Sequence, residues 1–167
     1  MAVLGIRIVP DPVLRQKAKR IRVADSSIQR LIDDMVETMR EAHGVGLAAP
    51  QVAKPVRLIV IETSEDGLVT LLNPEVVKSS GERNVVEGCL SVPGYQGEIR
   101  RAESIVVKGR DRKGKEVRIK AKDILAQALE HEIDHLNGVL YVDYINDKKK
   151  LKKINDQDHR ETQKELI

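Results

Sequence analysis

The chain has 167 residues, of which 41% are hydrophobic and 33% charged, and this balance indicates one soluble globular domain with a sizeable core. No apolar run approaches the roughly 20 residues of a membrane helix, and Arg7 interrupts the short apolar stretch at the start, so neither a membrane span nor a secretory signal is expected. The single cysteine, Cys89, excludes an internal disulfide and agrees with a cytoplasmic location.

Four segments carry helix signals. Apolar residues recur at helical spacing after Asp25 or Ser26, either of which can cap a helix. Asp123 can cap another helix in the same way, and Asn137-Gly138 can close it. The expected helices are a short one beginning at Pro12, one over about residues 26–42, one over about 124–136, and one from about Asp147 into the tail.

Short apolar or alternating runs predict the strands, over residues 56–61, 68–72, 104–108 and 116–120. Asn73-Pro74 is expected to end the second strand, and a turn at 112–114 is expected to join the last two as a hairpin. This order of elements favours an α+β fold with antiparallel sheet over repeated βαβ units.

The net charge of +3 is concentrated at the C-terminal end. Residues 148–167 carry seven Lys and Arg against four Asp and Glu, so residues 1–147 are neutral overall. We therefore expect a domain over 1–147 followed by a basic helical extension over 148–167, and any affinity for nucleic acid belongs to that extension.

His131 and His135 are four residues apart in the third helix, so both imidazoles lie on one face and can bind one metal ion. Glu132 lies beside them and can take a proton from metal-bound water. A catalytic site of this kind needs a third protein ligand and one open position. One family of metalloproteases places a third histidine six residues after the second, but Tyr141 occupies that position here.

Two further segments can complete the site. Cys89, in the segment 87–91, offers a thiolate, although a lone cysteine can equally be a small buried apolar residue. The segment 44–51 has two glycines that allow close approach of a ligand, and it ends on Gln51, whose amide can donate a hydrogen bond to an oxyanion. Taken alone, that segment is also compatible with a tight structural turn.

These three segments together resemble the peptide deformylase family, in its bacterial form. The family's motifs glycine-x-glycine-x-alanine-alanine-x-glutamine, glutamate-glycine-cysteine-x-serine and histidine-glutamate-x-x-histidine occur in order at 44–51, 87–91 and 131–135. The resemblance extends from Ile8 to Ile145. It implies an α+β fold with antiparallel sheets around a central metal-binding helix, together with a C-terminal helix.

The resemblance also implies a chemistry. Cys89, His131 and His135 are the metal ligands, and the metal is one Fe2+ per chain, with Zn2+, Ni2+ or Co2+ as substitutes. The reaction removes formyl from the N-terminal formyl-methionine of nascent polypeptides and releases formate. Metal-bound hydroxide attacks the formyl carbon, Glu132 acts as general base and then acid, and the Gln51 amide and the Leu90 backbone N–H face the oxyanion.

The methionine side chain needs an apolar pocket, and backbone near Val45 and Gly46 can pair with an extended substrate. The candidate pocket residues, each of which could equally be ordinary core, are Val45, Val85, Ile124, Ala128 and the ring of His131. Arg101 is expected to neutralise Glu87 and thereby to steady the Cys89 loop, unless the two form only an exposed pair.

Two alternatives compete with this interpretation. An endopeptidase would need a further ligand downstream of His135, and Tyr141 stands in its place. An RNA-binding protein with a structural metal would explain the basic tail, which can approach ribosomal RNA or can simply be a solvated helix face. No membrane or DNA partner is expected.

Overall fold

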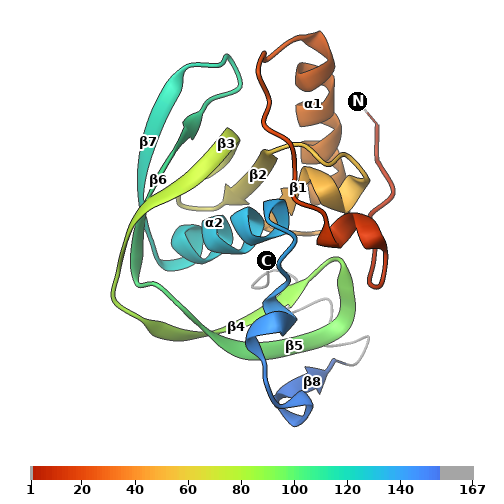
Figure 1. Cartoon of the computed structure of the whole chain (residues 1–167), viewed down its shortest axis with the longest axis vertical. Coiled ribbons are helices and arrows are strands. Elements are labelled where there is room, and N and C mark those ends of the chain that lie inside the picture. Colours follow the sequence, from red (N-terminus) through yellow and green to blue (C-terminus); the bar gives the residue numbers. More distant parts are fainter. Residues whose placement is uncertain (1, 155–167) are drawn as a thin grey trace.

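A computed structural model describes residues 2–154, and two α-helices and two antiparallel sheets make up most of it (Figure 1). The α-helices are α1 (Ser26–Glu41) and α2 (Asp123–Leu136). Short 3-10 helices are η1 (Pro12–Arg15), η2 (Ala49–Val52), η3 (Tyr141–Tyr144) and η4 (Lys148–Lys150). The α+β class with antiparallel sheets around a central helix is confirmed, and α2 is the more C-terminal of the two α-helices.

The larger sheet has five strands in the order β1-β2-β3-β6-β7, and the smaller has three in the order β4-β5-β8. The strands of the larger sheet are β1 (Gly46–Ala48), β2 (Leu58–Thr63), β3 (Gly67–Ser80), β6 (Ser104–Arg110) and β7 (Glu116–Lys122). Those of the smaller sheet are β4 (Arg83–Cys89), β5 (Val92–Arg101) and β8 (Leu151–Lys153).

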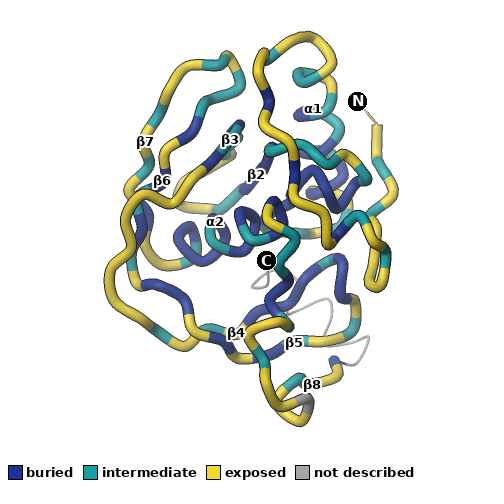
Figure 2. The backbone as a smooth tube through the Cα atoms, viewed as in Figure 1, coloured by how far each residue is buried: buried dark blue, intermediate teal, exposed yellow. Residues whose placement is uncertain are grey.

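Helix α2 lies between the two sheets and is almost wholly buried (Figures 1 and 2). Its apolar face packs on the larger sheet, where Ala126 and Leu129 join Ile105 and Val107 in one core cluster. Helix α1 covers another part of that sheet through Ile32, Met35 and Met39, which are 0% exposed. The amphipathic spacing that predicted both helices is therefore the spacing of their core contacts.

Three details of the predicted elements are corrected. Asp123 is the first residue of α2, and Lys122 takes the cap position. Strand β3 does not end at Asn73-Pro74, because the pair forms a bulge and the strand continues to Ser80. The Asn73 side chain holds this bulge by two hydrogen bonds of 2.8 Å to the backbone of Ile21.

The third correction concerns the start of the tail. Where a helix was expected from Asp147, residues 148–150 form a 3-10 turn and residues 151–153 form β8. Gly97 of β5 pairs with Leu151, whose half-buried side chain packs against the cluster around Cys89, so this strand satisfies the second edge of β5. The remainder of the extension, residues 155–167, lies outside the described residues.

Candidate metal centre

The two histidines of α2 face the smaller sheet and are buried, with exposures of 3% for His131 and 1% for His135. Cys89 comes from the end of β4 on the other side, and its Sγ lies 3.3 Å from His135 Nε2. The ligand atoms of Cys89, His131 and His135 all lie within 4.8 Å of one another. One thiolate and two imidazoles are donors that a divalent ion such as zinc or iron takes, so these residues fit such an ion.

Hydrogen bonding and burial prepare the two imidazoles as ligands. His131 Nδ1 lies 2.7 Å from Glu87 Oε1, so a ring proton faces the carboxylate and Nε2 is the nitrogen left for a metal. Burial lowers the pKa of His135 well below its usual 6.5, which keeps that ring neutral at pH 7. Burial alone would lower the pKa of His131, but hydrogen bonds to Cys89 and Glu87 outweigh burial and raise that pKa well above 6.5. A metal ion at Nε2 of His131 would therefore replace the second ring proton.

Glu87 and Arg101 form a buried pair, as predicted, and the alternative of an exposed pair is wrong. Arg101 donates from Nε and Nη2 to the two carboxylate oxygens, at 2.7 and 2.8 Å. Burial alone would raise the pKa of Glu87, but hydrogen bonds from Arg101 and His131 outweigh burial and lower it to about 2. The carboxylate is thus ionised and holds His131 in one orientation.

Glu132 is buried beside the ligand group, and its Oε2 has no hydrogen-bond partner among residues 2–154. Burial raises the pKa of Glu132 to about 7. Its other oxygen occupies the space next to Gly46, where a Cβ would lie 2.6 Å from Oε1. Glycine at position 46 therefore leaves room for a carboxylate that can exchange a proton near neutral pH.

Gln51 is held in a fixed direction at the same centre. Its Oε1 accepts from the backbone N–H of Ala48 at 3.0 Å, while Nε2 donates to Ser91 Oγ at 3.0 Å and lies 3.7 Å from Cys89 Sγ. Leu90 lies in the two-residue turn between β4 and β5, directly after Cys89. The structure thus brings Gln51 and the Cys89 loop together from distant parts of the chain.

The predicted pocket residues divide between two clusters. Val45 and Ile124 are partly buried and pack against the same core cluster as the fully buried Ala128. Val85 packs instead with the cluster that contains Cys89. Three of the four predicted pocket residues thus belong to the core between α2 and the larger sheet, and only Val85 shares a cluster with a proposed metal ligand.

Strand β1 is an end strand of its sheet, so one of its edges is free of strand partners within the described chain. The Val45 carbonyl accepts from Glu62 N at 2.8 Å, and Leu47 is opposite Val60 of β2. Because backbone groups alternate in direction along an antiparallel strand, those of Gly46 point away from β2. A peptide could pair with this edge.

Several contacts at the centre were not predicted from the sequence. Ser91 donates its backbone N–H to Cys89 Sγ at 3.4 Å. Tyr141, considered only as a missing ligand, stacks on His131 with ring centroids 6.2 Å apart. Asp134 accepts a hydrogen bond of 2.7 Å from Arg101. In the sequence, only Ser91 could have been recognised as a site residue, because it belongs to the motif at 87–91. The contacts of Tyr141 and Asp134 depend on how the chain folds.

A buried cysteine and two histidines beside a buried glutamate, with one of the histidines held by a carboxylate, form the site of a metal-dependent hydrolase. Residues 3–151 match the family described as polypeptide deformylase, and the chain belongs to that family. Within the described residues, no helix is long and apolar enough to cross a membrane.

Known proteins resemble almost the whole chain. A peptide deformylase of Dehalococcoides mccartyi (strain CBDB1) is 52% identical over 159 residues, which cover 95% of each chain. The crystal structure of a peptide deformylase from Legionella pneumophila superposes with a TM-score of 0.86 at 42% identity, over 98% of this chain and 95% of that one. A peptide deformylase from Synechococcus elongatus, in complex with actinonin, has a TM-score of 0.82 at 36% identity, over 98% and 87%.

Proposed function

We propose that this chain hydrolyses the formamide bond of formyl-methionine at the N-terminus of nascent polypeptides and releases formate. The observation that carries the proposal is the buried Glu132 carboxylate, whose Oε2 has no hydrogen-bond partner within the described part of the chain, beside the Cys89, His131 and His135 donor group. A closed structural metal site would have no use for such a base. Membership of the polypeptide deformylase family supports the choice of substrate.

Cys89, His131 and His135 would hold one divalent ion, which we propose to be Fe2+, with Zn2+, Ni2+ or Co2+ able to replace it. Such an ion supplies a bound water acidic enough to lose a proton near neutral pH. Two imidazoles and one thiolate leave a fourth position for that water. The hydrogen bond from His131 to Glu87 keeps the ring directed at the ion.

Glu132 would move the proton. As the water oxygen adds to the formyl carbon, the Glu132 carboxylate takes the water proton, and it returns that proton to the nitrogen when the C–N bond breaks. A carboxyl group whose pKa is about 7 can do both near neutral pH. Gln51 Nε2 and the backbone N–H of Leu90 would donate to the developing oxyanion.

The substrate would bind as an added strand along β1. The free backbone groups of Gly46 supply hydrogen bonds to an extended peptide, and this places the formyl end near Glu132. Val45, Val85, Ile124 and Ala128 would line the pocket for the methionine side chain.

We propose that the enzyme works in the cytoplasm, where nascent chains are made. The catalytic domain would span residues 1–147, and the basic extension 148–167 would contact ribosomal RNA. Deleting residues 148–167 and measuring ribosome binding at several salt concentrations tests the last point. Unchanged binding would rule out a role for those residues.

The proposed reaction is tested with protein purified without oxygen and loaded with Fe2+. We expect formate release from a short formyl-methionyl peptide, and much slower release of acetate from the acetylated peptide of the same sequence. Cleavage of an internal peptide bond without formate would favour an endopeptidase and contradict the proposal.

A further inference from the structure

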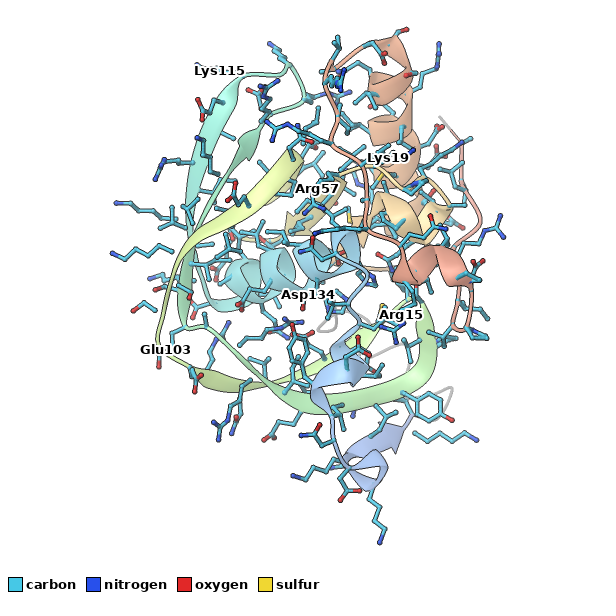
Figure 3. All side chains as sticks on the ribbon, viewed as in Figure 1. Arg15, Lys19, Arg57, Glu103, Lys115 and Asp134 are labelled. Atoms are coloured by element: carbon cyan, nitrogen blue, oxygen red, sulfur yellow. The ribbon has the colours of Figure 1, made fainter. Side chains whose placement is uncertain are left out.

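Tyr144 is half exposed, yet its side chain is held by two contacts with residues near the metal centre. Its hydroxyl donates to Asp134 Oδ2 at 2.9 Å. Its ring lies beside Arg101, with the guanidinium carbon 5.2 Å from the ring centroid. Figure 3 labels Asp134 on the side of α2 that faces the segment carrying η3.

Arg101 connects these contacts to a proposed metal ligand. Its Nη1 donates at 2.7 Å to the same Asp134 oxygen that Tyr144 contacts, while its Nε and Nη2 grip Glu87. Glu87 in turn lies 2.7 Å from His131 Nδ1. A continuous chain of hydrogen bonds thus runs from the surface to His131.

We propose that Tyr144 is a positioning residue for the metal centre, because it fixes Asp134 and Arg101 and thereby the Glu87 carboxylate that orients His131. This role rests on the proposed function of the Cys89, His131 and His135 group. Among Asp134, Arg101 and Glu87, Asp134 is the partly exposed residue, with 20% of its side chain accessible. Without the phenol it can turn to water, and Arg101 then loses the partner that locks its third nitrogen.

The rest of η3 supports this role. Asp143 binds Arg15 through two hydrogen bonds of 2.6 and 3.0 Å and also accepts from Leu140 N at 3.0 Å. Tyr141 stacks on His131 from the same turn. Burial and the neighbouring Asp134 carboxylate raise the pKa of Tyr144 to about 12, so its hydroxyl keeps its proton at neutral pH. The turn thus presents a rigid donor to Asp134.

The test is a cobalt titration of metal-free protein, followed by the thiolate-to-cobalt absorption band. Groups that hold metal-ligating histidines typically change affinity 10–100-fold when removed, and Tyr144 acts further out, so we expect Tyr144→Phe to weaken cobalt binding about 3–10-fold. Tyr144→Ala should weaken it more, since the ring contact with Arg101 is also lost. Tyr95→Phe is the matched control, because Tyr95 is exposed on β5. The affinity of this variant for cobalt should equal that of the parent protein.

Two comparisons separate positioning from general stability. The urea midpoint of metal-free Tyr144→Phe should stay close to that of Tyr95→Phe. If Tyr144 acts through Asp134, the double variant Tyr144→Phe/Asp134→Asn should bind cobalt no more weakly than Asp134→Asn alone. Unchanged affinity in Tyr144→Phe, or additive losses in the double variant, would overturn the inference. Failure of the parent protein to bind cobalt would instead overturn the proposed metal site.

Discussion

Replacing Arg101 by Met should destabilise the fold strongly, because it leaves the Glu87 carboxylate buried without its cation. The Glu87 side chain is 0% exposed and that of Arg101 is 4% exposed. Removing one partner of a buried ion pair typically costs about 3–5 kcal/mol. The lowering of the Glu87 pKa from 4.5 to about 2 corresponds to roughly 3 kcal/mol. Since His131 still contacts Glu87, we expect a loss near the lower end, about 3 kcal/mol.

The measurement is urea unfolding of the metal-free protein at pH 7, followed by circular dichroism. Arg100→Met is the matched control, since Arg100 pairs with Glu82 at 3.7 Å and both side chains are about three-quarters exposed. Exposed pairs contribute about 0–1 kcal/mol, so the control should change little. A loss below about 1 kcal/mol in Arg101→Met, equal to the control, would refute the claim that a buried charge pair organises this site.

Two further outcomes follow from the site. Gly46→Ala should reduce the rate of formate release about 100-fold, because the added Cβ would displace the Glu132 carboxylate. Gly5→Ala is the control and should leave that rate unchanged, because its Cβ meets nothing within 4 Å. Equal rates in the two variants would contradict the close contact between Gly46 and Glu132. The folded pKa of Glu87 lies below 4.5, so its stabilisation is present above pH 4.5 and disappears as pH falls toward 2. Between pH 5 and pH 3 the free energy of unfolding of Glu87→Gln should therefore fall less steeply than that of the parent protein. Equal slopes for the two proteins would contradict this role of Glu87.

Helices α1 and α2 and the β6–β7 hairpin could be predicted because their signals are local. Helix α1 carries an apolar stripe behind an Asp25 cap that accepts from Ile28 N at 3.0 Å. The turn after Asp111 contains Gly114 with positive φ, as a hairpin requires. These patterns depend on residues a few positions apart, so no tertiary information was needed.

Strands β4 and β5 were missed for a physical reason. Glu87 and Arg101 occupy inward positions of this hairpin, so the buried side chains do not form an apolar alternation. The two charges are tolerated there because they pair with each other. Strand β8 was missed because its pairing with β5 is distant in sequence and its residues are Lys-rich.

The metal ligands and the glutamate could be predicted from motifs, but the groups that hold them could not. Asp134 is in the predicted helix, yet nothing in its neighbours indicates the contact with Arg101, 33 positions away. Tyr144 reaches the same carboxylate only because η3 turns back after α2 (Figure 1). Spacing along one helix is fixed by geometry, whereas such contacts depend on how three elements pack.

The central claim, that Glu132 moves the proton at a metal held by other residues, is tested most directly by Glu132→Ala. Metal content and formate release should be measured on the same sample, with Glu130→Gln as the control. Glu130 is on the same helix as Glu132, but its side chain accepts a hydrogen bond from Ala102 N and lies outside the ligand group. We expect full metal content in both variants, and a rate of formate release that is reduced about 1,000-fold in Glu132→Ala only. Undiminished formate release from metal-loaded Glu132→Ala would contradict the account.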